Sequence, residues 1–154
     1  MSLESVRAFL AEKAPDLHIV ELDVSTATVA QAAAAHDVEP GRIAKTLSLR
    51  IGDKIVLIVV AGDARLDNRK FKAAFGAKPR LLEAADVAEI TGHPIGGVCP
   101  FGLANPLPIY CDESLRDLGE VVPAAGAVNA AVRIDALRLA ELVGAQWVDV
   151  CQDR

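Results

Sequence analysis

The residue types best suited to chemistry gather in one stretch, Thr91–Gly102, which reads TGHPIGGVCPFG. Cys99 and His93 are the types that form a thiol–imidazole nucleophile, which requires the ring within hydrogen-bond reach of the sulfur. Pro94 biases His93 towards an extended backbone, and nothing in the sequence directs the ring at Cys99. A lone loop cysteine is more often a small packed hydrophobe, so a Cys99/His93 thiol hydrolase is the less favoured hypothesis.

The glycines of the same stretch offer a chemistry of the backbone. Gly96 and Gly97 have no side chain, so their N–H groups can approach a carbonyl or an anion and stabilise developing negative charge. The alternative is a tight turn without a chemical role. The spacing matches neither a Walker loop nor a dinucleotide-binding fingerprint, and the pattern alone leaves both interpretations open.

Lys45 is the main candidate outside this stretch. It follows the break at Pro40–Ala44 and stands at the start of an alternating run. A lysine in this place is either a solvated charge at a strand end or an anchor for a phosphate or carboxylate. Thr46 could add a hydroxyl contact to such an anchor, or could simply favour the strand.

The elements that position these residues are a mixture of strands and helices. Residues 45–51 and 54–61 predict a hairpin turning at Gly52-Asp53. The first strand alternates apolar with polar residues, so one face is wet or lines a site, whereas the second is apolar on both faces and should be central. Helices are predicted over 2–14, 28–37, 67–75, 83–91 and 135–143, and further strands over 18–22, 80–82, 107–111, 121–122, 130–134 and 146–150. This order favours an α+β fold with a mixed, largely antiparallel central sheet flanked by helices.

Length and composition limit the class of protein. We expect the 154 residues to form a single domain over 1–154. Its three cysteines are odd in number and lack metal-type spacing, which favours a reducing compartment and neither disulfides nor structural zinc. No apolar run approaches a membrane span and no basic-then-apolar leader opens the chain, so we expect a cytoplasmic protein.

Charge restricts the partners. The formal net charge of −5 argues against a broad grip on nucleic acid, and DNA is not an expected partner. The segment 65–80 is nevertheless basic, since Asp67 is its only acid. Its basic residues are Arg65, Arg69, Lys70, Lys72, Lys78 and Arg80. Such a run is usually a solvated helix face, but a small patch that touches one end of a nucleic acid is the alternative.

Four stretches, taken in order, resemble the YbaK and prolyl-tRNA-synthetase-associated (ProX) domain family. They are Ala44–Leu47, Ala61–Asp63, Thr91–Gly102 and Leu107–Ser114. The resemblance implies a partly barrel-like α+β domain that acts as an editing deacylase, hydrolysing the ester between a wrong amino acid and a tRNA. Since the chain has no room for a synthetase, the resemblance implies the free-standing form, which acts in trans.

The resemblance also implies roles for individual residues. Lys45 matches a lysine that engages the 3′-terminal part of the tRNA, and Gly96 and Pro100 match a glycine-x-x-x-proline loop whose backbone faces the aminoacyl ester. Gly126 and Asn129 match a glycine-containing stretch before the last helix, and Asp63 matches a frequent aspartate. The predicted site therefore has Lys45, Gly96 and Gly97 as catalytic residues and Thr46, Asp63, Val98, Pro100, Phe101, Gly126 and Asn129 as substrate-binding residues.

The resulting hypothesis is metal-free, cofactor-free hydrolysis of a misacylated tRNA bound by its acceptor end. Lys45 would fix the 3′ end, and the Gly96–Pro100 backbone would hold the ester carbonyl while water attacks. The family implies a small or uncharged amino acid, with tRNA(Pro) as the commonest association and a synthetase as a possible partner. The rival hypothesis is a non-catalytic module that binds a tRNA end or a synthetase.

Overall fold

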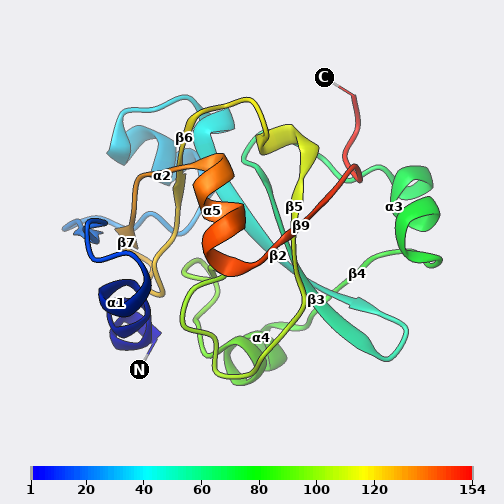
Figure 1. Ribbon diagram of the computed structural model, residues 1–154, viewed down its shortest axis with the longest axis horizontal. Helices are drawn as coiled ribbons and strands as arrows, with labels where there is room; N and C mark the ends of the chain where they lie inside the picture. Colours follow the sequence, from blue (N-terminus) through cyan, green and yellow to red (C-terminus); the bar gives the residue numbers. More distant parts are fainter. Residues whose placement is uncertain (1, 154) are drawn as a thin grey trace.

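A computed structural model of the chain describes residues 2–153 (Figure 1). The α-helices of this part of the chain are α1 (Ser2–Lys13), α2 (Val29–His36), α3 (Asn68–Phe75), α4 (Ala84–Thr91) and α5 (Ala136–Val143). Its 3-10 helices are η1 (Pro40–Arg42) and η2 (Glu113–Leu115). Its strands are β1 (Val20–Glu21), β2 (Ile43–Ile51), β3 (Lys54–Ala61), β4 (Arg80–Leu81), β5 (Ile109–Asp112), β6 (Glu120–Pro123), β7 (Ala130–Ala131), β8 (Ile134–Asp135) and β9 (Gln146–Val148).

The hairpin of β2 and β3 forms the centre of the larger sheet, whose strand order is β8-β6-β2-β3-β5-β9 with β4 also paired to β2. Strands β2 and β3 run antiparallel through eight residue pairs, and β4 and β8 also join antiparallel. The β2–β6, β3–β5 and β5–β9 pairings are parallel. The sheet curls into a half-barrel flanked by helices, and β1 pairs with β7 separately, so the predicted α+β fold with a mixed sheet is confirmed.

One edge of β2 is interrupted, and this interruption determines where a ligand can enter. Strand β6 pairs with Ile43 and Ala44 at the start of β2, and β4 pairs with Leu49 and Arg50 near its end. Residues 45–48 lie between these two pairings, and no strand among residues 2–153 is registered with them on that edge, where the nearest main-chain contact is the Leu82 N–H to the Ser48 carbonyl. A strand that lacks a neighbour presents its main-chain polar groups to whatever lies beyond.

The helix boundaries follow the capping residues read from the sequence. Thr28 and Gln31 form a reciprocal capping box at the start of α2, with the Thr28 hydroxyl accepting from the Gln31 N–H at 3.1 Å. Asp67 and Asp135 cap α3 and α5 by accepting from first-turn N–H groups, without a reciprocal bond within residues 2–153. The predicted strand over 130–134 is instead divided into β7 and β8, which pair with β1 and β6 respectively. The two short strands therefore serve different parts of the sheet.

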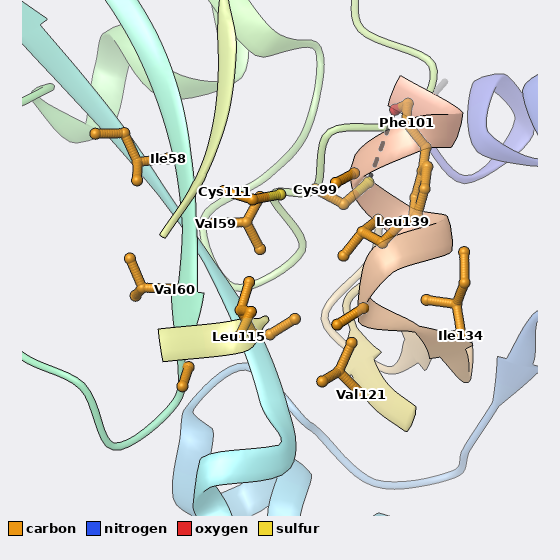
Figure 2. Packing of buried hydrophobic residues seen from close by; sticks show 14 of the residues in the cluster. Ile58, Val59, Val60, Cys99, Phe101, Cys111, Leu115, Val121, Ile134 and Leu139 are labelled. Atoms are coloured by element: carbon orange, nitrogen blue, oxygen red, sulfur yellow. Dashed lines mark hydrogen bonds between the residues drawn. The ribbon is translucent and has the colours of Figure 1, made fainter. Parts of the chain in front are cut away.

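The core lies between the sheet and helix α5, and Figure 2 shows Cys99 and Cys111 between Val59 of β3 and Leu139 of α5. All four side chains are completely buried. In Figure 1, α1 and α3 lie towards opposite ends of the long axis, and α4 lies at the bottom of the view. Among the described residues, no helix is both long and apolar enough to span a bilayer.

Candidate functional site

A pocket of about 250 Å³ opens at the interrupted edge of β2. Its walls come from the approach to α2, from β2 and β4, from the loop at 95–98, and from β6 and β7. Most of the lining is small and apolar, and Lys45 is the one charged residue in the described lining. The lining comprises Thr26, Ala27, Thr28, Val29, Ala32, Ile43, Ala44, Lys45, Thr46, Leu47, Ser48, Leu81, Leu82, Val87, Ile95, Gly96, Val98, Val122, Ala124, Ala130 and Ala131.

The hydroxyl groups of this pocket differ in what they bind. The Thr26 hydroxyl donates to the Val128 carbonyl at 3.1 Å, and the Thr28 hydroxyl is occupied in capping α2. Thr46 Oγ1, in contrast, is buried and has no hydrogen-bond partner among residues 2–153. A buried polar atom without a partner is costly, so Thr46 is the lining residue with the clearest capacity for a ligand.

Lys45 stands where the pocket meets a second, more open groove. The groove is lined by Lys45, Leu47, Gly62, Asp63, Ala64, Arg65, Leu66, Leu81 and Gln152. Lys45 is half-buried, and its Nζ donates to the Ala64 carbonyl at 3.4 Å. The structure thus places Lys45 and Asp63 in one groove, with the Lys45 ammonium held loosely by a neutral oxygen.

The backbone N–H groups of the predicted site differ in whether they are free to bind a ligand, and Gly97 marks the difference. Gly96 and Val98 line the pocket, and among the described residues neither of their N–H groups donates to another group. The Gly97 N–H instead donates to the Pro94 carbonyl at 2.9 Å, which closes a tight turn. The amides with capacity for an anion are therefore those of Gly96 and Val98, whereas the amide of Gly97, expected to be catalytic, is already used.

Position 96 requires a residue without a side chain for two reasons. Its φ of +88° lies in the left-handed region, and a Cβ at this position would lie 2.7 Å from the Cβ of Ala27. The loop therefore packs directly on the segment that leads into α2. This contact fixes the distance between the Gly96 amide and the opposite wall of the pocket.

His93 and Cys99 do lie together, which no sequence pattern indicated, but they lie inside the core. Their Nε2 and Sγ atoms are 3.6 Å apart, and both residues are completely buried. His93 Nε2 donates to the Phe101 carbonyl at 2.7 Å. Burial raises the pKa of the Cys99 thiol to about 12 and lowers the pKa of His93. Neither residue lines the pocket, so this pair stabilises the loop and has no access to a substrate.

Pro100 and Phe101 lie on the buried side of the loop, as His93 and Cys99 do. Both are buried, and the Phe101 ring packs on Phe9 of α1 with 5.8 Å between the ring centres. Neither belongs to the pocket lining. Their placement does not support the expected direct contact with a substrate, and it gives them a supporting position behind the loop.

Gly126 and Asn129 also lie behind the loop. The Gly126 N–H donates to the Gly97 carbonyl at 3.0 Å, and a Cβ on Gly126 would lie 2.7 Å from the Ser2 carbonyl oxygen. The Asn129 side chain donates to the Leu22 carbonyl at 2.9 Å. Neither residue lines the pocket. Both connect the loop region to the N-terminal part of the chain, and direct contact with substrate is not supported.

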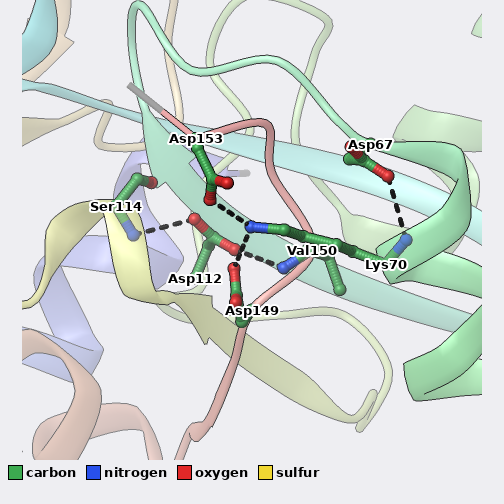
Figure 3. A network of polar contacts seen from close by, with 7 residues as sticks. All are labelled: Asp67, Lys70, Asp112, Ser114, Asp149, Val150 and Asp153. Carbon is green, nitrogen blue, oxygen red and sulfur yellow. Dashed lines mark hydrogen bonds and ion pairs between the residues drawn. The ribbon is translucent and has the colours of Figure 1, made fainter.

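The basic segment is partly neutralised by the C-terminal residues. Lys70 Nζ contacts Asp149 at 3.1 Å and Asp153 at 2.7 Å (Figure 3), and these carboxylates hold the pKa of Lys70 above its usual value. Arg80 differs, because it lies opposite Arg50 across β2 and β4, and neither arginine makes an ion pair with an acidic residue of the described part of the chain. Unneutralised positive charge therefore lies at β4 rather than on Lys70.

Sequence reasoning missed one side of the pocket. Leu81 and Ile95 stand at its mouth with 71% and 57% of their surface exposed, which is unusual for large apolar residues. The apolar pair Leu81-Leu82 on a very short strand was the available signal. Among residues 2–153, no group of three or more His, Cys, Asp or Glu side chains is arranged to hold a metal ion.

These features define a class of protein, namely an α+β domain with an apolar pocket at an interrupted sheet edge and a lysine at the pocket's mouth. The sequence model of the aminoacyl-tRNA editing domain matches residues 23–142. The chain belongs to this family, which confirms the resemblance seen in the sequence.

Similar proteins support the assignment. The uncharacterised protein YwhH of Bacillus subtilis (strain 168) is 46% identical over 155 residues, covering 99% of both chains. The crystal structure of a candidate trans-editing enzyme for prolyl tRNA synthetase superposes with a TM-score of 0.90 at 37% identity, covering 99% of this chain and 98% of the other. The proline–tRNA ligase of Solidesulfovibrio magneticus is 36% identical over 105 residues, which are 67% of this chain and only 18% of the ligase.

Proposed function

We propose that this protein is a deacylase that hydrolyses misacylated tRNA in trans. The observation that carries the proposal is the position of Lys45 between an apolar pocket and an open groove, in a chain of the aminoacyl-tRNA editing family. The pocket suits an aminoacyl group, and the groove suits the 3′-terminal nucleotide to which that group is esterified. Lys45 would then hold the negatively charged 3′ end at their junction.

In this mechanism the ester carbonyl lies against the amides of Gly96 and Val98. Water adds to the carbonyl carbon, and the two N–H groups stabilise the oxyanion that forms. The bond between the carbonyl carbon and the ribose oxygen then breaks, and the ribose oxygen takes up a proton as the free amino acid leaves. A hydroxyl of the terminal ribose assists the water. The rate gain comes from positioning and from preorganised dipoles, because Cys99 is buried away from the pocket.

The lining supports a small, uncharged aminoacyl group. Six of its residues are alanines, and the larger apolar side chains Val29, Ile43 and Val122 narrow the same space. No acidic side chain in the described lining could pair with a cationic substrate side chain. Hydroxyls and backbone groups, rather than a set of metal ligands, supply the polar contacts, so we propose that the reaction needs no metal. The similarity to proline–tRNA ligases makes tRNA(Pro) the first substrate to test.

Turnover distinguishes this proposal from a module that only binds a tRNA end or a synthetase. Alanyl-tRNA(Pro) is mixed with protein at one hundredth of its concentration, and free alanine is measured over time. We expect steady release well beyond one equivalent of protein, while correctly charged prolyl-tRNA(Pro) is spared. Protection of the ester, or release limited to the spontaneous rate, would favour the binding module.

A further inference from the structure

The open edge of β2 exposes main-chain groups at one residue in particular. The Leu82 N–H donates to the Ser48 carbonyl at 3.0 Å, so the main chain of Ser48 points towards the edge shared by β4 and β6. Main-chain groups of alternate residues in a strand point to the same side. The N–H and C=O of Thr46 therefore point to this edge, in the gap that neither β4 nor β6 fills.

The side chain of Thr46 adds a second group at the same place. Side chains alternate between the two faces of a strand. Lys45 and Leu47 line both the groove and the pocket, whereas Thr46 lines the pocket alone. Thr46 Oγ1 is buried there without a partner among the described residues. One residue thus offers the pocket an unused carbonyl oxygen and an unused hydroxyl.

The chemistry of an aminoacyl ester requires such groups. Its α-amino group is attached one carbon away from the reacting carbonyl, and in its protonated form it carries three N–H donors. The pocket holds no acidic side chain in its described lining, and its single charge, on Lys45, is positive. Neutral oxygens must therefore receive this ammonium, at a point away from Lys45, because like charges repel.

We propose that Thr46 is the subsite for the α-amino group of the aminoacyl ester, with its carbonyl and its hydroxyl as acceptors. The proposal rests on the deacylase function above and names a recognition element for it. The carbonyl and the hydroxyl of Thr46 can both accept from an ammonium, whereas the carbonyl oxygen repels a phosphate, so the amino group is the better occupant of this position. The subsite gives the enzyme a means of requiring a free amino group, so that esters with a blocked or missing one are poor substrates.

Esters that differ in the amino group alone test this subsite. The wild-type protein is given the same tRNA carrying either alanine or propionate, which lacks the amino group. A site built to hydrogen-bond a group rejects the analogue without it, so we expect kcat/KM to favour the alanyl ester by at least about tenfold. Equal rates on the two esters would overturn the subsite and leave the deacylase function standing. Absence of turnover on both would overturn the deacylase function, and the subsite with it.

A pair of variants then assigns the recognition to Thr46. Thr46→Val keeps the shape and the β-branch but removes the hydroxyl, and we expect the preference for alanyl over propionyl ester to shrink about tenfold. Thr46→Ser restores the hydroxyl and should recover most of the preference. A Thr46→Val variant that loses the same factor on both esters, or that keeps the full preference, would overturn the role of the hydroxyl. Thermal melting of both variants shows that the comparison is made between folded proteins.

Discussion

The two halves of the loop between His93 and Phe101 have opposite surroundings. The first half, with Gly96 and Val98, forms a wall of the pocket and keeps two amides unpaired within the described residues. The second half, from Cys99 to Phe101, is buried and packs on the core. Of the two residues that look most reactive in the sequence, Cys99 belongs to this buried half, and His93, which precedes the first half, is completely buried as well.

This difference shows how a short loop can be both exact in position and open to a ligand. His93 and Cys99 both direct their polar atoms at the Phe101 carbonyl, and the Gly97 carbonyl receives the Gly126 N–H. Because these bonds fix the buried half, the exposed half can leave its amides unpaired without collapsing. Preorganised donors of this kind need little reorganisation during a reaction.

The largest effect should come from Lys45, which lines the same pocket as this loop. Lys45→Ala should lower kcat/KM for deacylation about 1,000-fold, because the 3′ end loses its charged anchor. Stability should change by less than about 1 kcal/mol, since a half-exposed lysine contributes little. Steady-state deacylation and urea denaturation measure the two quantities.

Lys70→Ala is the matched control for this experiment. It removes another lysine, whose charge is already neutralised by Asp149 and Asp153, and should leave deacylation near the wild-type rate. Equal losses in the two variants, or near wild-type turnover by Lys45→Ala, would remove Lys45 from the mechanism.

Single substitutions in the two halves of the loop should separate activity from stability. Gly96→Ala places a Cβ against Ala27 at a φ of +88° and should lower kcat/KM about 30-fold through displacement of the amides, with about 1 to 2 kcal/mol of destabilisation. Cys99→Ser should cost a similar amount of stability through burial of a more polar group, but should keep activity within about twofold. Complete loss of activity in Cys99→Ser would revive the thiol hydrolase.

Alkaline pH offers a thermodynamic test of the buried half. Burial raises the pKa of Cys99 from 9.0 to about 12, so above pH 9 the unfolded chain loses this proton before the folded protein does. The free energy of unfolding should therefore fall between pH 9 and pH 12, by up to about 1.4 kcal/mol per pH unit for this thiol. Urea denaturation under reducing conditions at pH 8, 9 and 10 measures the slope.

Comparison with Cys99→Ala isolates the contribution of this one thiol. The burial of Cys111 and Cys151 raises their pKa values to about 12 as well, so part of the slope should remain in the variant. The slope should be smaller than in the wild type by up to about 1.4 kcal/mol per pH unit. Identical slopes in the two proteins would mean that Cys99 is accessible to solvent, against the division of the loop described above.

The smallest effect concerns the approach of the tRNA. Arg50 and Arg80 face each other on β2 and β4, and like charges in this arrangement are destabilising unless an anion joins them. Arg80→Ser should raise KM about threefold and reduce the salt dependence of KM by about one phosphate contact. Lys70→Ser, by comparison, should change neither quantity. If Lys70→Ser had the larger effect, the path of the tRNA would lie over α3 instead.

The sequence contained most of the local structure of this fold. The Thr28 capping box, the Gly52-Asp53 turn and the central position of β3 all follow from short-range patterns, and the structure has them. The alternation of β2 also predicted that one of its faces lines a site, and Thr46 and Ser48 do line the pocket. Such features depend on residues that are neighbours in the sequence, which is why they can be predicted from it.

Other parts of the site depend on contacts between distant residues. The gap on β2 exists because β4 and β6 both stop short of residues 45–48, and no local pattern encodes where two other strands end. The charge of Lys70 is neutralised by carboxylates that lie 79 and 83 positions further along the chain, so its own segment does not reveal its partners. The division of the loop at Gly97 likewise requires Gly126, which is close only in the folded protein.

The last described residues complete the groove beside Lys45, so this groove forms only after they have been synthesised. The Val150 N–H donates to the Asp112 carboxylate (Figure 3). The Gln152 N–H donates to the Arg65 carbonyl, and Gln152 lines the groove beside Lys45. During synthesis on the ribosome, the groove cannot close until residue 152 has emerged, long after Lys45 has been made. Any state of the chain in which residues 150–152 have detached would therefore leave the groove beside Lys45 incomplete.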